Sequence, residues 1–346
     1  MSASADTAKR TSLPSAFEPR VLVRRALQVG ALILVLVLIA LLAPGLGEVR
    51  HHLGEAKLGW IAVAVGLELL SCLSYVLMFR PIFCRRMSWR HSSRIAWSEL
   101  GMGSIVPASG AAGLALGAWA LVQSGMPPER VARRSVAFFL IKSSVNFVAV
   151  ALIGAAMALG LFGPDLSLWL TAFPAALSLL VIGAILLLPR LGEGATPPPD
   201  AGRAARWISA ARRSVIAGTR EAVEIVRSGD PLVLAGALGY WAFDNAVLWA
   251  TFHAFGAQVD ISIILLGYLI GQLGGLLPIP GGVGGIDGGL IGTLVVFGAP
   301  AAATAAAVLA YRVILFWLPL IGGTIGFVSL RRQLARDDGD ELLATC

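Results

Sequence analysis

Long apolar runs separated by short polar segments dominate the chain. The runs lie at Ala26–Ala43, Trp60–Phe79, Ser135–Phe162, Leu166–Pro189, Leu232–Phe255 and Ala301–Leu330. Each run approaches or exceeds the roughly 20 residues that a helix needs to cross the hydrocarbon core of a bilayer. The pattern therefore predicts an all-α polytopic membrane protein with about six transmembrane helices.

Two further apolar stretches, Ile95–Gln123 and Ile261–Val296, are interrupted at their centres by IVPASGAAG and LLPIPGGVGGIDGG. Irregular backbone cannot face lipid, because its unpaired N–H and C=O groups would have no hydrogen-bond partner there. We therefore expect two re-entrant helical hairpins. Glycine and proline at the second turn would let backbone N–H groups approach an anionic substrate. The residues that we expect to contact the substrate there are Pro280, Gly281, Gly282 and Gly284.

The order of a span, a hairpin and a span with a buried cation occurs twice. Lys142 follows the first hairpin proline, Pro107, by 35 residues, and Arg312 follows the second, Pro278, by 34. We expect repeat A, about 60–162, and repeat B, about 232–330, to be inverted relative to each other. Such an arrangement places a binding site near the bilayer midplane, between the two repeats.

The rest of the chain divides around these repeats. We expect a tail at 1–20, a flippase-like membrane domain at 21–330 and a second tail at 331–346. Between the repeats, 190–231 contains a linker and the amphipathic stretch Arg203–Arg227. This stretch is expected either to lie on anionic lipid as an interfacial helix or to dock on the spans.

Composition and charge set the class of protein and its orientation. Of 346 residues, 57% are hydrophobic and 14% charged, which excludes a soluble domain with one apolar core. A cytoplasmic N-terminus leaves almost all of the 27 Lys and Arg residues on the cytoplasmic side, as the positive-inside rule requires. We expect a protein of the plasma (inner) membrane with both termini in the cytoplasm, whose net charge of +7 attracts anionic lipid rather than nucleic acid.

Lys142 and Arg312 fall within predicted spans, where an unpaired cation is costly. They would bind a phosphate-bearing head group, or they would form structural ion pairs with the acids of the membrane domain: Glu68, Glu99, Asp244 and Asp287. The two roles are compatible if the ligand displaces a carboxylate.

Each acid also has a second interpretation. Asp287 would bind substrate or cap a helix that starts near Gly288. Glu99 would serve the site or stand at the boundary of a short helix, and Glu68 would pair with a cation or take part in coupling. Asp244 would pair with Arg312 or bind a proton or cation.

Two pairs of segments resemble a known family. PIPGGVGGID followed by AYRVILFWLPLIGG is similar to the second half of the lysylphosphatidylglycerol synthase transmembrane region, and SIVPASGAAGLALGAWALVQSGMP followed by FFLIKSSVNF is similar to its first half. The resemblance covers roughly 60–330 and implies lipid translocation or head-group handling in the plasma membrane. This chain has Asp287 where many members have Glu, and its first hairpin lacks the charges that many members place there. It does not extend to the soluble aminoacyl-transferase domain of bifunctional members, so lysyl transfer is not expected.

The chain has no P-loop and no metal-binding spacing, and we expect no cofactor, no metal and no catalytic residue. The leading hypothesis is a translocase for a membrane phospholipid or a polyprenyl-linked lipid, not an enzyme. The alternatives are an intramembrane lipid-modifying enzyme with Asp244, Glu68 or Asp287 as general base, and a non-transporting partner subunit of a lipid- or glycan-synthesising enzyme.

Overall fold

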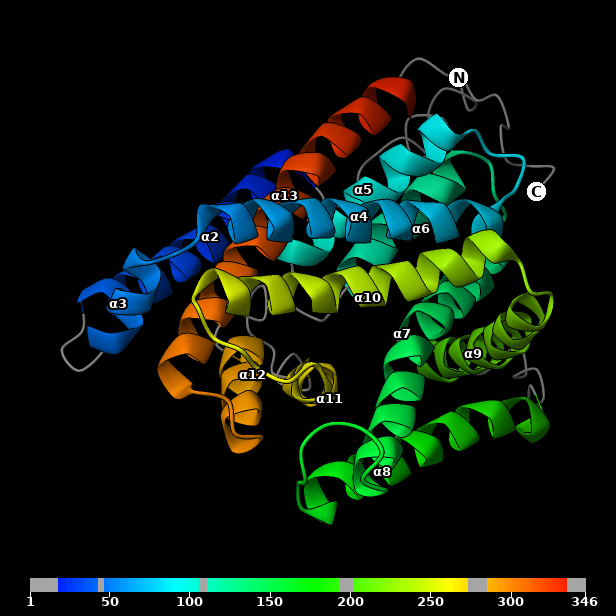
Figure 1. Ribbon diagram of the computed structural model, residues 1–346. Helices are drawn as coiled ribbons and strands as arrows, with labels where there is room; N and C mark the ends of the chain where they lie inside the picture. The colour runs from blue at the N-terminus through cyan, green and yellow to red at the C-terminus, as the bar shows by residue number, and fades with distance from the viewer. Residues whose placement is uncertain (1–17, 43–46, 106–110, 193–201, 273–284, 335–346) are drawn as a thin grey trace.

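The computed structural model describes residues 18–42, 47–105, 111–192, 202–272 and 285–334, and every regular element in these ranges is a helix (Figure 1). Six of the helices are long and apolar enough to cross a membrane, as the pattern of apolar runs predicted. They are α2 (Pro19–Leu42), α4 (Leu58–Phe83), α7 (Pro128–Ala158), α8 (Leu168–Leu187), α10 (Pro231–Ala254) and α13 (Ala301–Leu334). The protein is therefore an all-α, multi-pass membrane protein.

Four shorter helices form two pairs. α5 (Trp89–Ile105) packs on α6 (Ala111–Gln123), and α11 (Ile261–Gln272) packs on α12 (Gly285–Val296). Each pair falls within or overlaps one of the predicted hairpins, but the turns at 106–110 and 273–284 lie outside the described residues. Within the second pair the helices approach closely, because a Cβ added to Gly271 would stand 2.7 Å from the Cα of Leu290.

The remaining elements are α3 (Gly47–Gly54), the 3-10 turn η2 (Leu188–Leu191) and α9 (Arg203–Arg227). The amphipathic pattern predicted the bounds of α9. It did not predict α3, because the sequence GEVRHHLG has no apolar run to mark it.

The helices α4 and α10 lie side by side and antiparallel along their whole length (Figure 1). At one end the backbone N–H of Lys57 donates a hydrogen bond to the carbonyl of Ala254 at 2.9 Å, and at the other end Arg85 forms an ion pair with Asp230. Between these ends the backbones come close, since a Cβ added to Gly236 would stand 2.7 Å from the backbone nitrogen of Met78.

A second close contact joins α5 to α13. A Cβ added to Gly101 would stand 2.8 Å from the Cα of Gly323, so the two glycines let the helices touch backbone to backbone. At the far end of the same contact, Arg94 donates a hydrogen bond of 2.6 Å to Gln333. The first short pair is thus fixed against the last helix of the chain.

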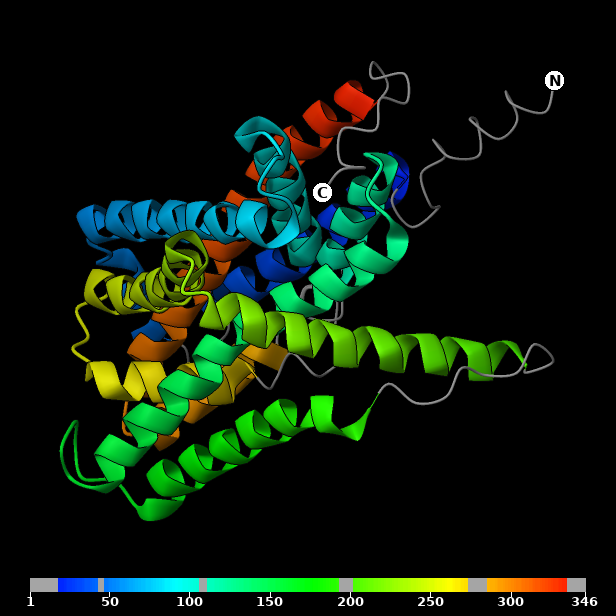
Figure 2. The ribbon, with the colours of Figure 1, turned by 90° about the vertical axis from the view of Figure 1, so that its right-hand side faces the viewer.

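The helix α9 packs on α7 through its second half, where Ile216 and Ala222 are buried and Glu221 lies 2.7 Å from Arg134. Its first half projects away from the bundle (Figure 2), with Trp207 and Ile208 exposed. The second half therefore docks on a span, as one interpretation expected, while contact of this helix with lipid stays a prediction.

Candidate functional site

A group of polar side chains lies buried among the apolar helices, around the crossing of α4 and α10. We call it the central polar cluster, and it draws on α4, α5, α7, α10, α11, α12 and α13. Its members are Glu68, Tyr75, Glu99, Lys142, Tyr240, Asp244, Tyr268, Asp287, Tyr311 and Arg312. Buried polar groups of this kind need partners, and the partners define two halves of the cluster.

The first half is built around Glu99 and Lys142. Glu99 is only 2% exposed, and its Oε2 accepts a hydrogen bond of 2.7 Å from the hydroxyl of Tyr75. The Nζ of Lys142 lies 5.8 Å from the ring centroid of Tyr75 and 5.7 Å from that of Tyr240, within cation–π range. The ammonium also interacts electrostatically with the carboxylates of Glu99 and Asp244. Glu99 therefore lies within α5 and not at its boundary, and its role in a site stays a prediction.

Gly117 of α6 makes room for the Glu99 carboxylate. A Cβ added at Gly117 would overlap Oε1 of Glu99. This oxygen is buried and makes no hydrogen bond to the residues that the structure describes. The absence of a side chain at Gly117 is what allows the carboxylate to stand between α5 and α6.

The second half is built around Asp244 of α10. The hydroxyl of Tyr268 donates a hydrogen bond to Oδ2 of Asp244, and the hydroxyl of Tyr311 donates one of 3.1 Å to Oδ1. Two phenol groups from α11 and α13 thus satisfy both oxygens of a carboxylate that is 8% exposed. Asp244 forms no direct ion pair with Arg312, but the two groups interact electrostatically, so the choice between its two predicted roles stays open.

Arg312 pairs instead with Asp287. Its Nε donates a hydrogen bond of 2.6 Å to Oδ1 of Asp287, and the two side chains are 12% and 10% exposed. Asp287 lies within the first turn of α12, which includes Gly285, so the alternative in which it caps a helix starting near Gly288 is wrong. Asp287 anchors α12 to α13 inside the membrane domain.

Glu68 completes the cluster beside Asp244. Its Oε1 lies 3.5 Å from the Sγ of Cys72, one turn further along α4, and its Oε2 is buried without a hydrogen bond to any described residue. Its carboxyl group interacts electrostatically with that of Asp244 across the α4–α10 crossing. Two acidic side chains are thus buried on the facing helices α4 and α10.

The cluster brings together Lys142, Arg312, Glu68, Glu99, Asp244 and Asp287, all of which the sequence singled out. The backbone positions Pro280, Gly281, Gly282 and Gly284 lie outside the described residues. In the part of the chain that the structure describes, no three His, Cys, Asp or Glu side chains gather where they could hold a metal ion.

Sequence reasoning missed the tyrosines. The chain has four, and all four belong to the cluster: Tyr75, Tyr240, Tyr268 and Tyr311. The signal was present in the sequence, since every one of them lies in an apolar stretch, where a phenol hydroxyl must find a partner.

Comparison with known proteins agrees with this picture of a membrane domain. A segment of 86 residues is 33% identical to a UPF0104 membrane protein of Methanothermobacter thermautotrophicus, and the match spans 25% of this chain and 26% of that relative. The profile of the lysylphosphatidylglycerol synthase TM region matches residues 27–323, which include every member of the central polar cluster. The chain belongs to the lysylphosphatidylglycerol synthase transmembrane-region family.

Proposed function

We propose that the protein is a translocase that binds the anionic head group of a membrane lipid at the central polar cluster. The observation that carries this proposal is the buried pair between Arg312 and Asp287. A lipid phosphate can take the place of the Asp287 carboxylate, because a guanidinium binds either anion with the same planar set of donors. The pair holds the cation in place while the site is empty and opens when the head group arrives.

Lys142 supplies a second cation for the same ligand. Its ammonium lies near two tyrosine rings and interacts electrostatically with the carboxylates of Glu99 and Asp244. The lysine ammonium is compact and its four-carbon stem is flexible. It can therefore turn toward a phosphate more easily than the planar guanidinium of an arginine. We propose that Lys142 and Arg312 bind the head group in turn as it crosses.

The arrangement of the helices supports a pathway between two inverted halves. The first helices of the halves, α4 and α10, are antiparallel, and each short pair packs against the last helix of the other half: α5 on α13, and α11 on α7. We propose that the short pairs are re-entrant hairpins and that repeats A and B are inverted copies. A site between such copies can open to each side of the membrane in turn.

The positions of the arginines support an orientation of the protein in the membrane. Arg85, Arg134 and Arg331 stand at helix ends that we assign to the cytoplasm under the positive-inside rule. We propose that the protein lies in the plasma membrane with both termini in the cytoplasm, and that its substrate is a phospholipid or a polyprenyl-linked lipid made on that side. A lipid- or glycan-synthesising enzyme is then the expected partner.

The hydrogen bonds of the acidic residues in the cluster support a role in transport more than a role in covalent catalysis. Glu99 accepts a hydrogen bond from Tyr75, Asp244 from two tyrosines, and Asp287 from Arg312. Carboxylates engaged in this way are stabilisers more than general bases. Glu68 differs in its partner, which is the weakly donating thiol of Cys72, while its Oε2, like Oε1 of Glu99, has no hydrogen bond to a described residue. We propose that Glu68 and Asp244 share a proton that couples transport to the proton gradient.

Lipid translocation by the purified protein in proteoliposomes tests the proposal, with a panel of fluorescent phosphatidylglycerol, aminoacylated phosphatidylglycerol and polyprenyl phosphate. The variants are Arg312→Ala and Lys142→Ala, and the matched control is Arg206→Ala, which removes an exposed arginine of α9. We expect the first two to lose translocation while their elution from a sizing column is unchanged, and the control to keep it. Equal rates in all four proteins would reject the two cations as the head-group path.

A further inference from the structure

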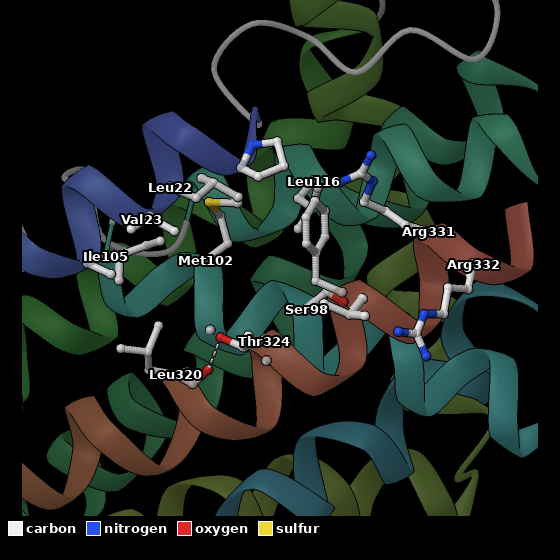
Figure 3. Close-up of a pocket in the computed structure, with 16 residues that line it drawn as sticks. Leu22, Val23, Ser98, Met102, Ile105, Leu116, Leu320, Thr324, Arg331 and Arg332 are labelled. Atoms are coloured by element: carbon white, nitrogen blue, oxygen red, sulfur yellow. Dashed lines mark hydrogen bonds between the residues drawn. The ribbon is translucent and has the colours of Figure 1, made fainter. Parts of the chain in front are cut away.

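A cavity lies between α2, α5 and α13 (Figure 3). Its volume is about 530 Å³, within the range of about 300–1,000 Å³ that is typical of ligand pockets. We call it the lateral groove. Nothing in its lining belongs to the central polar cluster: α5 contributes the stripe Ser98, Gly101, Met102 and Ile105, while its Glu99 turns to Tyr75 of α4.

The walls of the groove are apolar. Leu22 and Val23 of α2 lie opposite Leu320 of α13 across it (Figure 3), and Phe327 of α13 also lines it. Two hydroxyl groups reach the lining, but each bonds to a carbonyl of its own helix: Ser98 to Arg94 at 2.6 Å, and Thr324 to Leu320 at 2.7 Å. The walls are therefore suited to a hydrocarbon chain and not to a polar ligand.

One end of the groove is cationic. Arg331 and Arg332 both line that end, with their guanidinium groups turned in different directions, whereas Ile105 and Leu320 lie toward the other end (Figure 3). A neighbouring cavity of about 660 Å³ shares Pro19 and Val23 with the groove. Arg20 and Arg24 of α2 line this neighbouring cavity. Two further arginines, from α2, therefore lie next to the groove.

We propose that the lateral groove binds an anionic glycerophospholipid of the surrounding bilayer. One acyl chain lies along the apolar walls, and the phosphate sits at the end that carries Arg331 and Arg332. Charge complementarity selects this occupant, because a slot with apolar walls and two arginines at one end matches a molecule with a hydrocarbon tail and a phosphate at its head.

This site is independent of the proposed head-group path. Most of its lining from α13 (Thr324, Phe327, Val328, Arg331 and Arg332), together with Pro19, Leu22, Val23 and Ala26 of α2, lies outside the family match at 27–323. The bound lipid would join α2 to the bundle, because α2 makes few other contacts and much of its surface, such as Leu27 and Leu34, is exposed.

Photo-crosslinking with the full-length protein tests the proposal. The protein is placed in nanodiscs that contain a trace of phosphatidylglycerol or phosphatidylcholine with a photoreactive acyl chain, and labelled peptides are identified by mass spectrometry. Thr324→Trp fills the groove from an exposed position. Ile325→Trp is the matched control, because Ile325 is 64% exposed on the same helix and does not line the groove. Arg331→Gln with Arg332→Gln removes the cationic end, and Arg206→Gln with Arg227→Gln removes two exposed arginines elsewhere.

Labelling of α2 and of the last two turns of α13 is expected for the wild type, with phosphatidylglycerol preferred. Thr324→Trp should lower this labelling at least fivefold, and Ile325→Trp should not. Loss of Arg331 and Arg332 should reduce the preference for phosphatidylglycerol by about tenfold or more, since each arginine near a membrane surface favours anionic lipid. Unchanged labelling in Thr324→Trp, or equal labelling by the two lipids in the wild type, would overturn the proposal.

Discussion

The Nε of Arg312 donates a hydrogen bond of 2.6 Å to Oδ1 of Asp287, which joins the last helix of the chain to the short helix α12 inside the membrane domain. Neither side chain is more than 12% exposed. A pair in such a position has a structural effect and, in our proposal, a functional one. The two can be separated by experiment.

Removing one partner of the pair should destabilise the protein. Arg312→Met alone leaves the Asp287 carboxylate buried without its cation, a change that typically costs about 3–5 kcal/mol. The double variant Arg312→Met with Asp287→Leu should recover most of this stability, because no buried charge remains. Thermal unfolding in detergent measures both effects. If the pair is only structural, the double variant should also translocate lipid; we expect that it does not.

The two tyrosines that bond Asp244 should matter more than Tyr240, whose ring lies beside Lys142 and Tyr75. Tyr268→Phe and Tyr311→Phe each remove a hydrogen bond to a carboxylate, worth about 1.5–3 kcal/mol. Tyr240→Phe is the control, because it keeps the aromatic ring beside Lys142 and the main-chain oxygen that accepts from Ser71. Unfolding temperatures should fall for the first two variants and change little for the third. Equal effects of all three would contradict this account of the second half of the cluster.

The space at Gly117 is predicted to be essential for the position of Glu99. Gly117→Ala puts a methyl group where Oε1 of Glu99 stands and should destabilise the protein by about 1–3 kcal/mol, the range for overpacking a filled interior. Gly66→Ala is the matched substitution in a spanning helix, since an added Cβ there meets nothing within 4 Å. It should be neutral or slightly stabilising. A Gly117→Ala protein as stable as Gly66→Ala would show that the carboxylate can move away freely.

Glu68 should affect coupling and not head-group binding. Glu68→Gln keeps the size of the side chain and removes its exchangeable charge, so downhill exchange of lipid should continue while acceleration by a proton gradient is lost. The measurement compares lipid translocation in proteoliposomes with and without an imposed gradient. Cys72→Ser, which keeps a hydrogen-bond donor beside Oε1 of Glu68 and leaves the carboxyl group in place, is the control. A gradient response that survives in Glu68→Gln would exclude this carboxylate as the coupling group.

The sequence predicted the spans because length and hydrophobicity are local properties. It also predicted α9, since its apolar residues recur at helical spacing after a Pro/Gly linker. It identified Lys142 and Arg312 by their cost in hydrocarbon. It could not decide which acid pairs with Arg312, because Asp287 lies 25 residues away along the chain. For the same reason it could not identify Tyr311, 67 residues from Asp244, as a partner of that carboxylate. Such pairs exist only once helices that are distant in the sequence have packed.

The lateral groove shows the same limit more strongly. Its lining combines α2, near the start of the chain, with α13, near its end, and α5 from the first half. No single stretch among these has a composition that signals a lipid site. Arg331 and Arg332 in particular look like ordinary positive-inside residues until the apolar cavity beside them is known.

The most direct test of the central claim is the affinity of a short-chain phosphatidylglycerol for wild type, Asp287→Asn and Arg312→Ala, measured in detergent. All three should carry Thr324→Trp, so that the lateral groove does not contribute. If the lipid phosphate displaces the Asp287 carboxylate, Asp287→Asn should bind more tightly than wild type, by roughly tenfold for each 1.4 kcal/mol of competition removed. Arg312→Ala should lose binding. Weaker binding by Asp287→Asn, or unchanged binding by Arg312→Ala, would contradict the account.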